Sequence, residues 1–242
     1  METGTEEGFV MQDDLTILYY TANRIDDGFA SRIRQHLHQL IDGRVRIMSV
    51  SQKPIDFGDN ICVGEDIGYS AWVCYYQILQ GAKEARTPFV ACAEDDSLYT
   101  WEHFGVRPPG DSFHYNKNRW ILEDTGEPRP RFRWRDRTAM CGCVAPTELL
   151  IRTLEEKFSK FPDPIRQTYD PRLRGWGEPG RYERVLHLPQ VGITFFETEL
   201  PILTLNHKKG LGGLRRPSIN DKILLNLPPW DDAKTLWKVY HG

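Results

Sequence analysis

The amino-acid sequence predicts an α/β fold in which helices flank a mostly parallel, Rossmann-like sheet, with a smaller antiparallel portion beside it. Residues 15–93 contain two strand–helix–strand steps, and the three strands in these steps are nearly continuous apolar runs. Strands of this kind are buried on both faces, as in parallel sheets that helices cover on both sides.

The first half of the chain supplies these elements in order. Runs rich in β-branched and aromatic residues mark the strands, and apolar residues at helical spacing, such as Ile33 and Leu37, mark the first helix. Gly43 stands where glycine commonly ends a helix. We expect a strand at 15–20, a helix at 29–41, a strand at 45–50, a loop at 52–68, a helix at 72–79 and a strand at 89–93.

The second half is less regular. Residues 99–138 are rich in Pro, Arg and aromatic residues, which favours a long excursion over the sheet with short antiparallel strands such as 119–122. Pro146 suits the first turn of a helix whose apolar face includes Leu150 and Leu154. We further expect a strand at 138–145, a loop at 162–190, β-structure at 191–205, a Gly- and Lys-rich loop at 206–216 and then a polar tail.

Composition limits the class of protein. The 242 residues are 40% hydrophobic and 12% aromatic, which is enough for a substantial core. The net charge of −3 argues against a protein that binds polyanions over its whole surface, although a local basic groove stays compatible with it. No apolar run approaches the roughly 20 residues that a membrane span requires, so we expect no membrane partner.

The N-terminal residues and the cysteines predict a cytoplasmic location. Residues 1–7 are acidic and polar, the opposite of a secretory signal. The five cysteines include no Cys-x-x-Cys pair, and those inside apolar runs suit small buried thiols. The chain also lacks a Gly-x-x-x-x-Gly-Lys-Ser/Thr phosphate loop, a Gly-x-Ser-x-Gly elbow and a His-Glu-x-x-His zinc motif.

Consecutive carboxylates, Glu94, Asp95 and Asp96, come directly after the strand at 89–93. Parallel sheets bind ligands at the carboxyl ends of their strands, and hard cations such as Mn²⁺ or Mg²⁺ prefer oxygen ligands and keep positions open for phosphates. Alternation along an extended chain would point Glu94 and Asp96 the same way, so we expect this pair to face a metal. The alternative is that Asp95 or Asp96 caps a turn that begins at Ser97.

The loop at 206–216 is the second informative cluster. Its glycines let backbone amides approach a ligand closely, and Lys209 and Arg215 belong to the four cations around them, a combination suited to a diphosphate. His207 follows an apolar run and is expected to supply an imidazole to the same metal. The alternative is a solvated loop with a surface histidine.

The third cluster is the segment 129–137, in which five arginines are interleaved with Phe132 and Trp134. Such a segment can contact phosphates and stack on nucleic-acid bases. The alternative is a two-sided strand in which Phe132 and Trp134 pack inward and the arginines are solvated.

This layout resembles the GT-A glycosyltransferases, especially family 2-like enzymes. The resemblance rests on the order of a nucleotide-type sheet, the acidic motif at 94–96 and the later histidine His207, and it leaves residues 100–137 unmatched. It implies one domain over residues 1–242. Its parts would be a nucleotide-binding half at 15–99, an acceptor side with the metal and diphosphate loop at 100–216, and a tail at 217–242.

The resemblance implies metal-dependent transfer of a sugar, a hexose or pentose, from a nucleoside-diphosphate donor such as a UDP-sugar to an acceptor hydroxyl. Glu94, Asp96 and His207 would hold Mn²⁺ or Mg²⁺. The nucleotide sugar would be bound by Thr21, Ala22, Asn23, Gln52, Asp95, Lys209 and Arg215.

One departure from the family concerns the catalytic base. Inverting members usually carry an acidic pair after the strand that corresponds to 139–145, and this sequence has none there. Glu178, beside Trp176, is the candidate base, with an ordinary turn residue as the alternative.

The strand at 141–145 is also similar to that of small bacteriophage glycosyltransferases, some of which decorate modified DNA bases. This resemblance implies DNA as a candidate acceptor and the host cytoplasm as the location. Two other functions stay open. A sugar-phosphate nucleotidyltransferase would need a Gly-rich loop after the first strand, where residues 21–24 have no glycine. The second is a non-catalytic sugar- or nucleic-acid-binding module.

Overall fold

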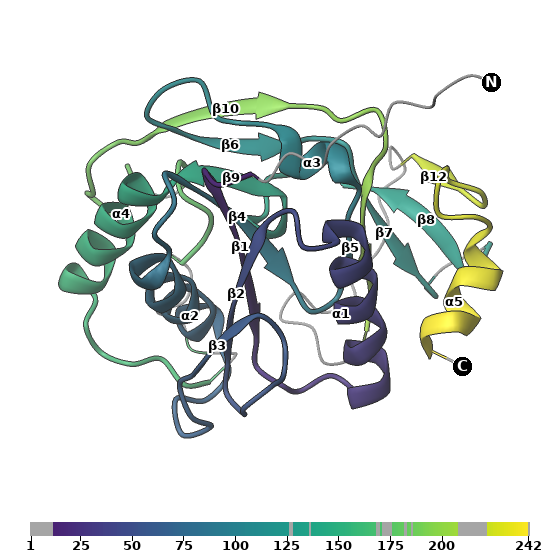
Figure 1. Ribbon diagram of the computed structural model, residues 1–242, viewed down its shortest axis with the longest axis horizontal. Helices are drawn as coiled ribbons and strands as arrows, with labels where there is room; N and C mark the ends of the chain where they lie inside the picture. Colours follow the sequence, from purple (N-terminus) through teal and green to yellow (C-terminus); the bar gives the residue numbers. More distant parts are fainter. Residues whose placement is uncertain are drawn as a thin grey trace, which may run out of the picture.

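The computed structural model describes residues 12–125, 128–135, 137–167, 170, 176–181, 183–184, 186–207 and 222–241 (Figure 1). Sheet A contains β1 (Leu15–Thr21), β2 (Arg46–Ser51), β3 (Asp59–Cys62), β4 (Phe89–Glu94), β6 (Ser112–Asn116), β9 (Cys143–Pro146) and β10 (Gly192–Phe196). Sheet B contains β5 (Ser97–Leu98), β7 (Arg119–Glu123), β8 (Arg131–Trp134), β11 (Ile202–Leu205) and β12 (Ile223–Leu224). The helices are α1 (Asp27–Ile41), α2 (Ala71–Glu84), α3 (Trp101–Gly105), α4 (Thr147–Lys160) and α5 (Ala233–His241), with a 3-10 turn η1 (Met140–Gly142).

The strand order confirms the predicted α/β class. Sheet A runs β10-β6-β9-β4-β1-β2-β3, and only β9 is antiparallel to its neighbours among these strands. Sheet B runs β12-β8-β7-β11-β5 and is mostly antiparallel. The carboxyl ends of β1, β2 and β4 therefore lie at one edge of sheet A.

Sheet A is covered on both faces because its central strands are apolar on both. In β1, Leu18 and Tyr20 pack under α2 and α4, while Ile17 and Tyr19 pack on the opposite face with Leu37 of α1. Figure 1 shows α2 and α4 side by side on their face of the sheet. The continuous apolar pattern in the sequence is thus explained by burial on two sides.

Local features fix where the helices begin and how closely they pack. The Asp26 side chain accepts a hydrogen bond from the Phe29 N–H at 3.1 Å, and the chain leaves α1 through Asp42 in the left-handed region. Gly81 allows α2 to lie against the sheet. A Cβ atom there would be 2.8 Å from Val50 Cγ2 and 2.9 Å from Leu18 Cδ1.

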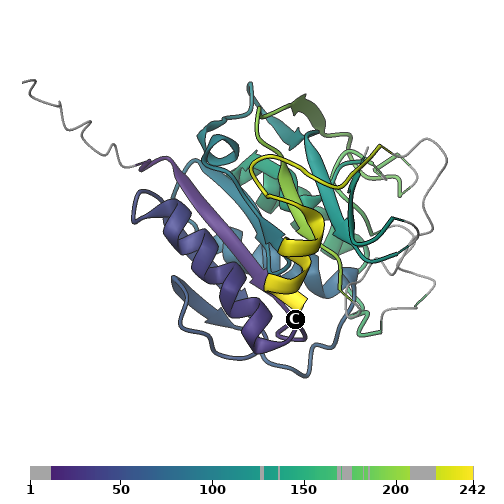
Figure 2. The same cartoon turned by 90° about the vertical axis from the view of Figure 1, so that its right-hand side faces the viewer.

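A third apolar cluster lies between sheet B and the helices α1 and α5. It includes Phe29 and Ile33 of α1, Phe132 of β8 and Tyr240 of α5. Figure 2 shows α5, in yellow, in front of the strands it covers. The expected polar tail at 217–242 is therefore wrong for its described residues, which form β12 and α5 and cover apolar surface.

Several predicted boundaries differ from the structure. The loop expected at 52–68 contains β3, which pairs with β2, and the excursion at 99–138 contains β6, an inner strand of sheet A. The strand expected at 138–145 is a 3-10 turn followed by β9. Among the described residues, no helix has the length and hydropathy needed to cross a membrane.

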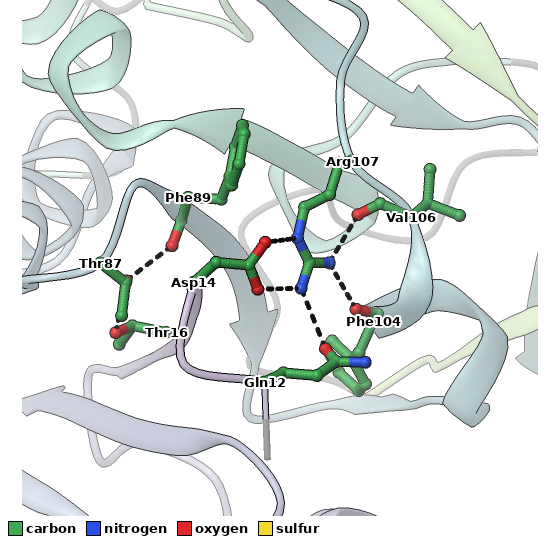
Figure 3. Close-up of polar contacts among 8 residues, drawn as sticks. All are labelled: Gln12, Asp14, Thr16, Thr87, Phe89, Phe104, Val106 and Arg107. Carbon is green, nitrogen blue, oxygen red and sulfur yellow. Dashed lines mark hydrogen bonds and ion pairs between the residues drawn. The ribbon is translucent and has the colours of Figure 1, made fainter. Parts of the chain in front are cut away.

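The edge of sheet A where β1 begins is held by Arg107, which follows α3 (Figure 3). Its guanidinium donates to both carboxylate oxygens of Asp14, at 2.8 and 2.7 Å, and to the Gln12 side chain at 3.0 Å. It also donates to the backbone carbonyls of Phe104 and Val106. These bonds and the charge of Arg107 lower the pKa of Asp14. This anchor lies at the end of β1 opposite to its carboxyl end.

Candidate functional site

A cavity of about 470 Å³ opens at the carboxyl ends of β1 and β4. One face of sheet B and the segment 176–181 contribute the rest of its wall. The structure brings seven predicted site residues to this cavity, which are Thr21, Ala22, Glu94, Asp95, Asp96, Glu178 and His207. Lys209 and Arg215 lie outside the described residues.

The carboxylates at 94–96 form a turn. Strand β4 ends at Glu94, the chain turns at Asp95 and Asp96, and Ser97 begins β5. The expected alternation of side chains is therefore wrong, because all three carboxylates line the same cavity. The alternative of a cap on a helical turn is also wrong, because a strand begins at Ser97.

Two hydroxyl groups at the end of β1 hold two of these carboxylates. The Tyr20 hydroxyl donates to Glu94 Oε1 at 2.5 Å, and the Thr21 hydroxyl donates to Asp95. Burial, followed by the negative charge of Asp96, raises the pKa of Glu94 and that of Asp95 to about 7. The raised pKa values thus mean that nearby protein groups do not fully offset the negative charge of the three carboxylates.

His207 joins this turn from sheet B. It follows β11, and its Nε2 atom lies 3.4 Å from Asp96 Oδ2. The backbone N–H of Leu205 donates to the Asp96 carbonyl at 2.7 Å, which keeps the two segments together. Over the described parts of the chain, however, no three His, Cys, Asp or Glu side chains are arranged to hold a metal ion by themselves.

Asn23 and Gln52 lie at the same edge of the sheet but bind backbone groups. The Asn23 side-chain oxygen accepts from the N–H groups of Gln52 and Lys53, both at 2.9 Å, and the Gln52 amide donates to the Gly68 carbonyl at 2.6 Å. The Asn23 bonds tie the end of β1 to the end of β2, and the Gln52 bond ties the end of β2 to the loop before α2. Neither residue lines the cavity.

Further residues at the carboxyl end of β1 belong to the site but were not predicted from the sequence. Arg24 lines the cavity and stacks over the Tyr69 ring, with 4.5 Å between guanidinium carbon and ring centroid. Gln77 of α2 is 1% exposed and donates to the Thr21 carbonyl at 2.7 Å. The position of Arg24 after the first strand could have indicated it, whereas Tyr69 and Gln77 reach the site only through the fold.

The arginine-rich segment has one apolar face and one charged face. Phe132 is buried and Trp134 partly buried in the apolar cluster between sheet B and the helices, as the two-sided alternative predicted. Arg129 and Arg137 are exposed, as that alternative also expected, but the arginines between them are not all solvated. Arg131 and Arg133 are 2% and 4% exposed, and both donate to the buried Glu123 carboxylate. The charged face is turned toward the cavity, which Arg133 lines.

A buried lysine supports the segment that carries Glu178. Lys157 of α4 is fully buried, donates to the Gly177 carbonyl at 3.1 Å and lies 5.5 Å from the centroid of Trp176. Burial lowers its pKa. Glu178 lines the cavity and pairs with Arg181 at 3.2 Å. The candidate base is therefore placed on a supported segment.

Comparison with known proteins shows likeness in structure. No protein-family model matches the sequence, and neither does any curated protein. The crystal structure of S. aureus TarS 1–349 in complex with UDP-GlcNAc matches with a TM-score of 0.52 and 10% identity, over 84% of this chain and 62% of that one. The chain shares that fold. A glycosyltransferase involved in glycosylation of the major capsid of PBCV-1 matches with a TM-score of 0.46 and 10% identity, over 78% and 91% of the two chains.

Proposed function

We propose that this protein is a metal-dependent glycosyltransferase, which transfers a sugar from a nucleoside-diphosphate donor to an acceptor hydroxyl. The observation that carries the proposal is the carboxylate turn at 94–96 with His207 beside it, at the carboxyl ends of parallel strands and inside the cavity. The fold shared with TarS 1–349, which holds UDP-GlcNAc, supports a UDP-sugar as the donor and a place in the family 2-like GT-A group.

The nucleoside would lie at the edge formed by Thr21 and Ala22, where Arg24 and Tyr69 offer a flat surface for a base. Asp95 would contact the donor from the turn. Lys209 and Arg215 keep their predicted role at the diphosphate. Asn23 and Gln52 would act on the nucleoside only through the backbone that they hold.

The residues present fit a divalent cation in part. Asp96 and His207 lie side by side, and Glu94 lies in the same turn, so these residues would hold Mn²⁺ or Mg²⁺. Burial and the charge of Asp96 raise the pKa of Glu94 and of Asp95, and a cation that offset this repulsion would be consistent with these shifts. Because Mg²⁺ usually keeps waters and phosphate oxygens as ligands, a few protein ligands suffice. The cation would neutralise charge on the departing diphosphate.

Glu178 would take the proton of the acceptor hydroxyl. Its carboxylate lines the cavity, Arg181 orients it, and Lys157 fixes the backbone of the preceding residue. The acceptor side would be the arginine-bearing face of sheet B. A DNA base in a phage-infected host is one acceptor that this face suits, because arginines bind the phosphates of nucleic acid.

The proposal can be tested with radiolabelled UDP-hexoses and UDP-pentoses in separate reactions. With Mn²⁺ the protein should release free sugar slowly even without acceptor, and calorimetry should detect UDP binding that requires the metal. Asp96→Asn should weaken metal-dependent UDP binding by about tenfold or more. The exposed Asp56→Asn is the matched control and should leave binding unchanged.

The outcomes separate the candidate functions. Neither sugar release nor binding of any nucleoside diphosphate would refute the glycosyltransferase. Release of pyrophosphate from a nucleoside triphosphate and a sugar phosphate would identify a nucleotidyltransferase instead. Donor binding that survives Asp96→Ala without turnover would identify a non-catalytic sugar-binding module.

A further inference from the structure

Arg119 of β7 is a buried cation that forms no ion pair with any described residue. It is 4% exposed and lines the cavity. Its Nη2 atom donates to the Arg137 carbonyl at 3.1 Å, and its Nη1 atom lies 3.8 Å from Cys141 Sγ. A guanidinium carries five N–H groups, and the Nε–H group of Arg119 has no hydrogen-bond partner in the described part of the chain. Both contacts are therefore with neutral groups, and some donors of the guanidinium are left unused.

The buried arginines of the neighbouring strand are balanced in a different way. Arg131 and Arg133 share the buried Glu123 carboxylate. A buried guanidinium with only neutral contacts is unfavourable, and an anion beside it offsets much of that unfavourable burial. Because Arg119 stands in the wall of the cavity, an anion that enters the cavity can take this place.

The guanidinium of Arg119 lies beside the carboxylate turn. The Ser97 hydroxyl donates to Asp96 Oδ1 at 3.0 Å. The Ser97 side chain also interacts with Cys141, which is the residue that Arg119 contacts. Burial raises the pKa of the Glu94 carboxyl, and the positive charge of Arg119 opposes this shift. These contacts, together with the shared cavity, place Arg119 next to the carboxylates that are proposed to hold the metal.

The carboxylates of the turn already have other partners. Glu94 Oε1 accepts from the Tyr20 hydroxyl at 2.5 Å. Asp96 Oδ2 lies 3.4 Å from His207 Nε2. A diphosphate held by a metal at this turn would bring further anionic oxygens to the same part of the cavity, and guanidinium forks match phosphate oxygens. The diphosphate of the donor is therefore the anion that suits the unused donors of Arg119.

We propose that Arg119 is a donor-binding residue, and that its guanidinium contacts the diphosphate of the nucleotide sugar. This inference rests on the proposed glycosyl transfer and adds a residue to it. In that reaction the bond between the anomeric carbon and the phosphate oxygen breaks, and its electron pair stays on the phosphate oxygen. The acceptor oxygen forms the new bond to the anomeric carbon, and Glu178 takes the acceptor proton. Arg119, held in place by Cys141 and the Arg137 carbonyl, stabilises the negative charge that the departing diphosphate gains.

Calorimetry in Mg²⁺ with UDP, inorganic pyrophosphate and uridine, which has no phosphate, tests the assignment. Arg119→Lys keeps the positive charge but loses the fork, and should weaken the binding of UDP and of pyrophosphate by about tenfold or more. Uridine affinity should change by less than about threefold. Electron paramagnetic resonance should find the same Mn²⁺ affinity in wild type and variant, because Arg119 is not a metal ligand. The exposed Arg46→Lys is the matched control and should alter none of these affinities.

Other results overturn the assignment. Unchanged affinity for UDP and pyrophosphate in Arg119→Lys would show that Arg119 does not contact the diphosphate, and an equal loss of Mn²⁺ affinity would show that it only supports the carboxylate turn. If the variant does not fold, a crystal structure of the wild type with UDP and Mg²⁺ decides, because a diphosphate oxygen should lie about 3 Å from a guanidinium nitrogen of Arg119. A separation above about 5 Å would refute the contact. If the wild type fails to bind UDP but binds pyrophosphate through Arg119, the glycosyltransferase proposal fails while the anion site stands.

Discussion

Glu123→Gln should destabilise the fold strongly, because Glu123 is the carboxylate shared by two buried arginines. Glu123, Arg131 and Arg133 have side chains that are 1%, 2% and 4% exposed. The closest contacts are 3.1 Å from Arg131 Nη2 and 2.7 Å from Arg133 Nη2. Glutamine keeps the size of the side chain and one acceptor oxygen, but it removes the negative charge and directs an N–H group at a guanidinium.

Removing one partner of a buried ion pair costs about 3–5 kcal/mol. The retained acceptor oxygen places the expected loss for Glu123→Gln at the lower end, at about 3 kcal/mol of unfolding free energy. With an m-value of about 3 kcal/mol per molar urea, the midpoint of urea unfolding should fall by about 1 M. Tryptophan fluorescence and far-UV circular dichroism should report the same midpoint if unfolding is two-state.

Two further variants give this experiment its controls. Glu84→Gln makes the same chemical change at an exposed position and should alter stability by less than about 0.5 kcal/mol. The triple variant Glu123→Leu, Arg131→Met and Arg133→Met removes all three charges together and should recover most of the lost stability. A loss below about 1 kcal/mol in Glu123→Gln would refute the reasoning, because it would mean that other groups balance these arginines.

Three more predictions concern the fold and the supported segment of the site. Arg107→Gln should cost about 1 kcal/mol of unfolding free energy, since Asp14 is partly exposed. The bonds that lower the pKa of Asp14 stabilise the fold at pH values above the ordinary carboxyl pKa of about 4. This contribution is lost as the pH falls through the lowered pKa, so the unfolding free energies of wild type and variant should converge in acid. Gly81→Val should lower the melting temperature by several degrees, because its Cβ would lie within 3.0 Å of side chains from two strands, whereas the exposed Gly105→Val should not. Lys157→Met should lower the turnover of donor sugar and leave UDP affinity unchanged, since Lys157 holds the Gly177 carbonyl and not the nucleotide edge. An equal loss of UDP affinity would contradict that last prediction.

The parts of the fold that the sequence predicts are those fixed by local pattern. Strands β1 and β4 are continuous apolar runs, and α1 shows its apolar face and its glycine stop within one segment. Strand β6 was missed because its residues, Ser112 to Asn116, are a mixture of polar and aromatic types. Its partners β9 and β10 lie far along the chain, and only that pairing makes it a strand.

The site shows the same limit. The position of 94–96 after a buried strand was enough to place these carboxylates at the binding edge, but strand alternation failed there because the backbone turns after Glu94. The contact between Asp96 and His207 joins residues more than a hundred positions apart, and it agrees with the expectation that these two residues share one site. Asn23 has the residue type of a ligand contact, yet its oxygen accepts from the backbone of the neighbouring strand end.

The packing of α5 has a practical consequence for handling the protein. His241 stacks on Trp237 with ring centroids 3.7 Å apart, contacts the Asn206 carbonyl at 3.0 Å and shares the Phe29 ring with His207. A polyhistidine tag fused behind this helix would start next to the imidazole expected to bind Mn²⁺ and would compete for the same ion. A purification tag ahead of β1 would lie at the opposite edge of sheet A. If the tag behind α5 competes for the ion, the two fusions should differ in their affinity for Mn²⁺.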